Sequence, residues 1–109
     1  MADRIIIEWN EAKQAIVSIA NICSCVCTIF NNGKAKVMIL DSVFVDEPYR
    51  GQGYGQKLIE EIINFAKTQS IDSVELQVNQ DNEVGINLYE KNQFQKTNKH
   101  YYRLILNKW

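Results

Sequence analysis

The chain has 109 residues, of which 46% are apolar, and this suits one packed domain covering residues 1–109. Twelve basic residues against thirteen acidic ones leave a net charge of −1, so we expect no nucleic-acid partner. No apolar run approaches the ~20 residues that cross a membrane, and the N-terminus lacks a signal-peptide pattern. We therefore expect a globular domain with no membrane partner.

Three cysteines alternate with other residues at positions 23, 25 and 27. Alternation places Cys23, Cys25 and Cys27 on one face of a strand, where free thiols behave as small apolar side chains. A metal site would more usually show C-x-x-C pairs and histidines, and His100 is the only histidine. We expect no metal and no disulfide, and hence a reducing, cytoplasmic location.

The first half of the chain is rich in β-branched residues and predicts four strands, at residues 4–9, 15–20, 23–30 and 36–45. Asn31-Asn32-Gly33, between the last two, is a strong hairpin signal. Together these segments predict an antiparallel meander.

In the second half of the chain, the spacing of apolar residues changes from that of strands to that of a helix. Residues 55–68 carry apolar side chains at helical spacing, which are Leu58, Ile59, Ile62, Ile63 and Ala66. A strand is predicted at 73–79, a short helix at 84–92, and two closing strands at 93–97 and 101–106. This order predicts an α/β (α+β) layer with mixed strand directions.

A glycine-punctuated loop lies between the fourth strand and the first helix, with glycines at 51, 53 and 55. Glycine lets a ligand approach the backbone without meeting a Cβ, and unpaired N–H groups at a helix N-terminus suit a phosphate. The spacing is not G-x-G-x-x-G, and the Walker A lysine is missing.

What the loop does match is Arg-x-x-Gly-x-Gly, carried by Arg50, Gly53 and Gly55. It resembles the pyrophosphate loop of the GNAT superfamily of acetyl-CoA-dependent N-acetyltransferases. Residues 82–91 resemble a second element of that family, Asn-x-x-Ala-x-x-Leu-Tyr-x-Lys. Two motifs in the family's order are far more specific than either alone.

Two positions depart from the second motif. Gly85 replaces the usual alanine, which we expect to be a mild change. Asn92-Gln93 stands where the family favours a glycine in the left-handed conformation, and we expect Asn92 to adopt it.

The resemblance implies a mixed, mostly antiparallel sheet with helices on both faces and a splayed strand pair, around 41–45 and 74–79. The family normally begins with a strand and two helices that form one wall of the substrate cleft. This sequence matches from the family's second strand onward. We expect either that the wall is absent or that a second subunit supplies it, which favours a homodimer.

The resemblance also implies acetyl-CoA as co-substrate, with pantetheine between the splayed strands and pyrophosphate on the loop amides. Asn82 would bond the pantetheine arm, and it would also serve as a helix N-cap. The implied cofactor-binding residues are Val43, Phe44, Val45, Arg50, Gly51, Gln52, Gly53, Tyr54, Gly55, Gln56, Asn82 and Tyr89.

Tyr89 is the expected general acid, because a phenol of pKa ~10 can protonate a departing thiolate of pKa ~8.5. Family members that acetylate ribosomal-protein N-termini carry a glutamate where Gln77 stands, and glutamine cannot accept a proton. The remaining candidates for the base are Glu75, on the same strand, and Asp41, which matches an acidic position of glucosamine-6-phosphate acetyltransferases. A water relay would suffice for an α-amine.

Two functions remain open. One is direct acetyl transfer from acetyl-CoA to a primary amine, in a small molecule or a peptide, with no covalent intermediate. The other is a non-catalytic acyl-CoA-binding or sensing module, suggested by the shortened N-terminus and by Gln77. Tyr89 separates them, because a binding module has no need of an acid.

Overall fold

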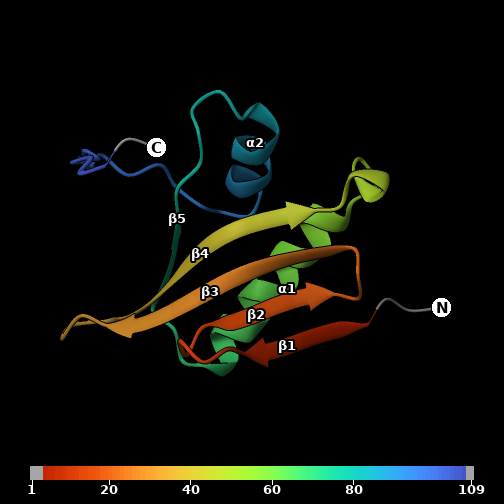
Figure 1. Cartoon of the computed structure of the whole chain (residues 1–109), viewed down its shortest axis with the longest axis horizontal. Helices are drawn as coiled ribbons and strands as arrows, with labels where there is room; N and C mark the ends of the chain where they lie inside the picture. The colour runs from red at the N-terminus through yellow and green to blue at the C-terminus, as the bar shows by residue number, and fades with distance from the viewer. Residues whose placement is uncertain (1–3, 108–109) are drawn as a thin grey trace.

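A computed structural model describes residues 4–107, which form one five-stranded sheet with two helices (Figure 1). The strands lie side by side in chain order. They are β1 (Ile5–Trp9), β2 (Ala15–Ile19), β3 (Cys23–Asn31), β4 (Lys36–Val45) and β5 (Ser73–Leu76). β1 to β4 pair antiparallel, and β5 joins β4 in parallel. The predicted meander is confirmed.

The β3–β4 hairpin turns where the asparagine-glycine signal predicted. Asn31 Oδ1 accepts from the Gly33 N–H at 2.8 Å, and Asn32 Oδ1 accepts from the N–H groups of Lys34 and Ala35 at 2.9 and 2.8 Å. Gly33 has φ of 89°, which a side chain would disfavour. The turn therefore sets the register that pairs Asn31 with Lys36.

Helix α1 (Tyr54–Thr68) covers one face of the sheet and buries the apolar side predicted for it. Leu58, Ile59 and Ile62 are fully buried there against β2, β3 and β4. Cys23, Cys25 and Cys27 belong to the same core and are free thiols, so the prediction of a cysteine-bearing core face is confirmed. Burial of these side chains is the main driving force for this layer.

β4 and β5 separate midway along β4. They pair only from Val37 with Ser73 to Leu40 with Leu76, after which β5 ends and β4 continues for five residues. Just beyond this point β4 is bulged, because Ser42 and Val43 together oppose Cys25. Ser42 has φ of 53° at the bulge. A bulge bends its strand and increases the local twist, which explains why the pair splays here.

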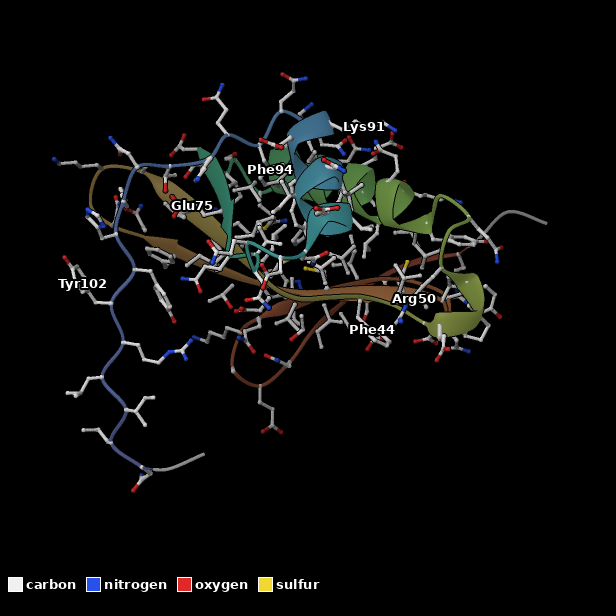
Figure 2. The ribbon with its side chains drawn as sticks, turned by 90° about the horizontal axis from the view of Figure 1, so that it is seen from above. Phe44, Arg50, Glu75, Lys91, Phe94 and Tyr102 are labelled. Carbon is white, nitrogen blue, oxygen red and sulfur yellow. The ribbon has the colours of Figure 1, made fainter. Side chains whose placement is uncertain are left out.

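Helix α2 (Glu83–Lys91) lies on the same face as α1 (Figures 1 and 2). Leu88 and Tyr89 of α2 pack against the core that α1 covers. The fold class is as predicted, but helices on both faces are not seen among residues 4–107. The reason is that α1 and α2 share one apolar cluster, and residues 4–107 hold no third long helix for the other face.

Three further expectations are corrected. Strand β5 stops at Leu76, so 77–79 are not strand, and neither 93–97 nor 101–106 forms one. Asn92 has φ of −97°, and Gln93 takes the left-handed conformation instead, with φ of 72°. Asn92 keeps a negative φ because its side-chain Nδ2 donates to the Leu88 carbonyl at 2.8 Å.

Candidate functional site

The loop before α1 has the geometry of an anion cradle. Gly51 and Gly53 have φ of 77° and 88°, and a Cβ at either would meet nothing within 4 Å, so their surroundings are open. Gly53 is the N-cap, no side chain caps the helix, and the first turn carries no acidic residue. The first N–H groups of α1 are thus left for a ligand beside the positive end of the helix dipole.

Arg50 braces the start of this loop. Its Nε–H donates to the Val45 carbonyl at 2.8 Å, and its guanidinium lies 5.3 Å from the centre of the Phe44 ring. Figure 2 shows the two side chains together at the end of β4. Phe44 is half exposed, so the contact stabilises the loop by about 0.5–1 kcal/mol. The sequence motif identified Arg50, but its partner Phe44 emerges only from the structure.

The last residues of β4 present an open edge on the β5 side. The Asp46 N–H donates to the Ile22 carbonyl at 2.8 Å, on the β3 side. The N–H and C=O groups of consecutive strand residues point to opposite edges, so the N–H and C=O of Val45 point toward the gap between β4 and β5. The Val45 carbonyl already accepts from Arg50, which leaves its N–H facing that gap.

Asn82 is the N-cap of α2. Its Oδ1 accepts from the Gly85 N–H at 2.9 Å, which leaves its Nδ2 for another partner. A Cβ at Gly85 would lie 2.7 Å from that Nδ2. A side chain at this position would therefore require the end of the Asn82 amide, which is flexible, to shift.

An amide clamp, formed by Gln56 and Asn92, joins the two helices. Gln56 Nε2 donates to Asn92 Oδ1 at 2.9 Å, and Asn92 Nδ2 donates to Gln56 Oε1 at 2.7 Å. Gln56 lies in the first turn of α1 and Asn92 caps the end of α2. The clamp thus ties the cradle to the helix that carries Tyr89. Sequence reasoning missed it, because no local pattern links residues so far apart.

Tyr89 lies half-buried on the sheet-facing side of α2. Its ring packs edge-on against Phe94, with centroids 5.8 Å apart. Burial, with a smaller contribution from the nearby Cys25 sulfur, raises the pKa of Tyr89 above its usual value. Because its pKa is raised, the hydroxyl is protonated at neutral pH. The hydroxyl makes no hydrogen bond to residues 4–107, and none of the side-chain polar atoms of these residues is both fully buried and unpaired. The Tyr89 hydroxyl is therefore accessible to solvent.

The candidate carboxylates lie on the other face of the sheet. Asp41 pairs with Val26, which alternates with the core residues Cys25 and Cys27, so Asp41 points away from the helices. Glu75 lies between two residues that pack on the core, and it points away too. Both are exposed, as is Gln77 just beyond β5.

The thiols of the core take no part in this surface. Cys25, Cys27 and Cys23 are at most 4% exposed. A hydrogen bond with Cys27 and burial together raise the pKa of Cys25, so it stays protonated. A buried neutral thiol is a packing group rather than a nucleophile.

Comparison with known proteins agrees with this geometry. The sequence profile of the Acetyltransferase (GNAT) family matches residues 3–94. The uncharacterized N-acetyltransferase MJ1207 of Methanocaldococcus jannaschii is 35% identical over 74 residues, which cover 67% of this chain and 33% of that protein. The uncharacterized N-acetyltransferase YobR of Bacillus subtilis is 32% identical over 65 residues, covering 60% and 26%. A solved acetyltransferase of Trypanosoma brucei superposes with a TM-score of 0.67 at 25% identity, covering 85% of this chain and 68% of that one.

The chain belongs to the GNAT acetyltransferase family. It spans about a third of MJ1207 and about a quarter of YobR. Within residues 4–107, neither helix is long and apolar enough to span a membrane.

Proposed function

We propose that the chain transfers an acetyl group from acetyl-CoA to a primary amine by direct attack. The observation that supports this proposal is that three features of the site lie next to one another. The splay between β4 and β5 opens beside an uncapped, glycine-lined helix N-terminus, and an accessible tyrosine lies on the next helix. A cofactor with a diphosphate, an amide-bearing arm and a thioester matches these three features in turn.

The diphosphate would bind the amides of residues 51–56, where no side chain competes for them. The pantetheine arm would follow the open edge at Val43–Val45, because its amides can pair with backbone groups that β5 leaves unbonded. The Asn82 Nδ2 would donate to the same arm, since only its Oδ1 is used by the cap.

Tyr89 would act as the general acid. When the amine nitrogen bonds to the thioester carbonyl, the tetrahedral intermediate collapses, the C–S bond breaks and the sulfur leaves with the electron pair. The Tyr89 hydroxyl gives that sulfur its proton, which the amine's released proton replaces through solvent. Because burial raises the pKa of Tyr89, the acid form persists to a pH above its ordinary ~10.

The base would act from the opposite face. Asp41 and Glu75 lie across the sheet from Tyr89, so attack and departure would occupy opposite sides of the thioester. An α-amine of pKa ~8 needs only a carboxylate or a water held by Gln77, whereas a lysine of pKa ~10.4 needs more help. A small-molecule or peptide α-amine is therefore the favoured acceptor. The free thiols fit a reducing compartment such as the cytoplasm.

Two measurements test the proposal. Thermal unfolding with and without saturating acetyl-CoA measures binding, and no rise in Tm would contradict it. A thiol-release assay over a panel of amines measures turnover, with Tyr89→Phe as the variant and Tyr49→Phe, on the 3-10 turn after β4, as the matched control. We expect Tyr89→Phe to lower kcat about 100-fold with acetyl-CoA binding retained. Binding without release for any amine would instead favour the non-catalytic acyl-CoA module.

A further inference from the structure

Cys25 lies beneath the candidate site, on the face of β3 that the helices cover. Its side chain is fully buried, and it belongs to the core against which Tyr89 of α2 packs. Burial first, and then the nearby Cys25 sulfur, raise the pKa of Tyr89, which agrees with this closeness. Cys25 is therefore a neighbour of the proposed acid, although solvent does not reach it.

The Cys25 thiol also bonds to the strand that forms the other side of the site. Its S–H donates to the Asp41 carbonyl of β4, with sulfur and oxygen 3.4 Å apart. The Val26 carbonyl, from the next residue of β3, lies 3.5 Å from the same sulfur. A thiol has one hydrogen and is a weak donor, so the two carbonyls share it. Of these two contacts, only the one to Asp41 crosses between strands.

Asp41 is the residue at which the β4 bulge begins. From Asp41 to Phe44, β4 advances three residues while β3 advances two. The extra residue resets the alternation of side chains, so Asp41 and Phe44 both point away from the helices. The bulge therefore sets the direction of Asp41 and also the edge that β4 presents at the splay.

The backbone of this bulge is not one that its sequence favours. Ser42, which follows Asp41, has φ of 53°, and residues other than glycine seldom take this conformation. Such a backbone persists where the surrounding structure holds it. Ser42 itself is exposed, whereas the Cys25 thiol bonds to the neighbouring carbonyl from the buried side.

We propose that Cys25 is a positioning residue for acetyl transfer. By bonding to the Asp41 carbonyl it holds the β4 bulge, and so it fixes the edge of β4 along which the pantetheine arm would lie. This role rests on the proposed function, because the arm is its premise. Cys25 touches neither acetyl-CoA nor the amine, and its thiol stays protonated and unmodified throughout.

Calorimetric binding of acetyl-CoA to two variants of Cys25 tests the proposal. Cys25→Ala removes the donor, and we expect the Kd for acetyl-CoA to rise about threefold to tenfold. Cys25→Ser keeps a donor on the same Cβ, and its Kd should stay within about twofold of the wild-type value. A residue that only fills the core would not be rescued in this way, since serine packs no better there than alanine.

Val17→Ala is the matched control. Val17 is fully buried and pairs directly with Cys25, but it lies on β2, on the side away from the bulge. Its truncation should cost at least as much stability in urea unfolding as Cys25→Ala does. Its Kd for acetyl-CoA should nevertheless stay within about twofold of that of the wild type.

Hydrogen exchange in the free protein tests the bulge separately from cofactor binding. The amides of residues 42–44 should exchange at least about threefold faster in Cys25→Ala than in the wild type or in Val17→Ala. Ser42→Val is a second variant that leaves the core intact, because the position is exposed. A β-branched side chain disfavours the left-handed φ, so this variant should speed the same exchange and raise the Kd similarly.

The two proposals fail in different ways. If the wild type does not bind acetyl-CoA, the proposed function is wrong, and unchanged exchange at 42–44 in Cys25→Ala would separately refute the hold on the bulge. If the wild type binds, the positioning role is refuted by an unchanged Kd in Cys25→Ala. A Kd that serine does not restore, or an equal loss of affinity in Val17→Ala, would refute it too.

Discussion

The Gln56–Asn92 amide clamp is the contact through which the cradle and α2 are held together, and its strength can be estimated from its geometry. Gln56→Ala removes two half-buried hydrogen bonds of 2.7 and 2.9 Å. At about 0.5–1.5 kcal/mol each, the cost is about 1–3 kcal/mol. Asn92→Ala also removes the 2.8 Å bond to the Leu88 carbonyl, so it should cost about 1.5–4.5 kcal/mol.

The two changes should not be additive. Once Asn92 is gone, Gln56 has lost its partner, so the double variant should be little worse than Asn92→Ala alone. The coupling energy should be about 1–3 kcal/mol, as for residues in direct contact. Urea unfolding of the wild type, both single variants and the double variant, followed by circular dichroism, gives this number.

Glu60→Ala is the matched control for this double-mutant cycle of Gln56 and Asn92. Gln56 Nε2 also donates to Glu60 Oε1 at 2.9 Å, an exposed contact that is separate from the clamp. Removing Glu60 should cost less than about 0.5 kcal/mol. Additive effects of Gln56→Ala and Asn92→Ala, with coupling below about 0.3 kcal/mol, would refute the clamp.

Four further outcomes follow from the structure. Gln93→Gly should stabilise the chain by about 0.5–1 kcal/mol in urea unfolding, because it relieves a left-handed φ of 72°; a loss of stability would contradict that conformation. Ile62→Ala should cost about 2–5 kcal/mol, since the side chain is fully buried; a cost below 1 would mean that α1 packs elsewhere. Arg50→Ala should weaken acetyl-CoA binding about threefold to tenfold in calorimetry, by releasing the Val45 carbonyl; unchanged affinity would count against the brace. The three cysteines should react with a thiol reagent only on unfolding, and a rapidly titrating thiol in the native protein would disprove their burial.

The elements with strong local signals were predictable. The hairpin at Asn31-Asn32-Gly33 and helix α1 formed where turn chemistry and periodicity indicated, because the energies that decide them act between near neighbours. Strand composition at 101–106 was equally strong, yet no strand formed there within one chain. A strand needs a partner in register, and composition cannot say whether one is within reach.

The candidate site divides in the same way. The loop at 50–55 and the element at 82–91 could be recognised as motifs in the sequence, because the backbone conformation there requires particular residue types in a fixed order. Their relative position in space could not be predicted from the sequence. The splay beyond Leu40 depends on a bulge at Ser42, and the face opposite Tyr89 that holds Asp41 depends on strand pairing.

The sequence by itself determined the family, the meander and the positions of the two family motifs, because each rests on interactions a few residues apart. Tertiary structure alone decided that both helices share one face, that Gln56 reaches Asn92, and that Gln93 rather than Asn92 turns left-handed. The physical reason is that such contacts join distant segments through packing, whose energy depends on every neighbour at once.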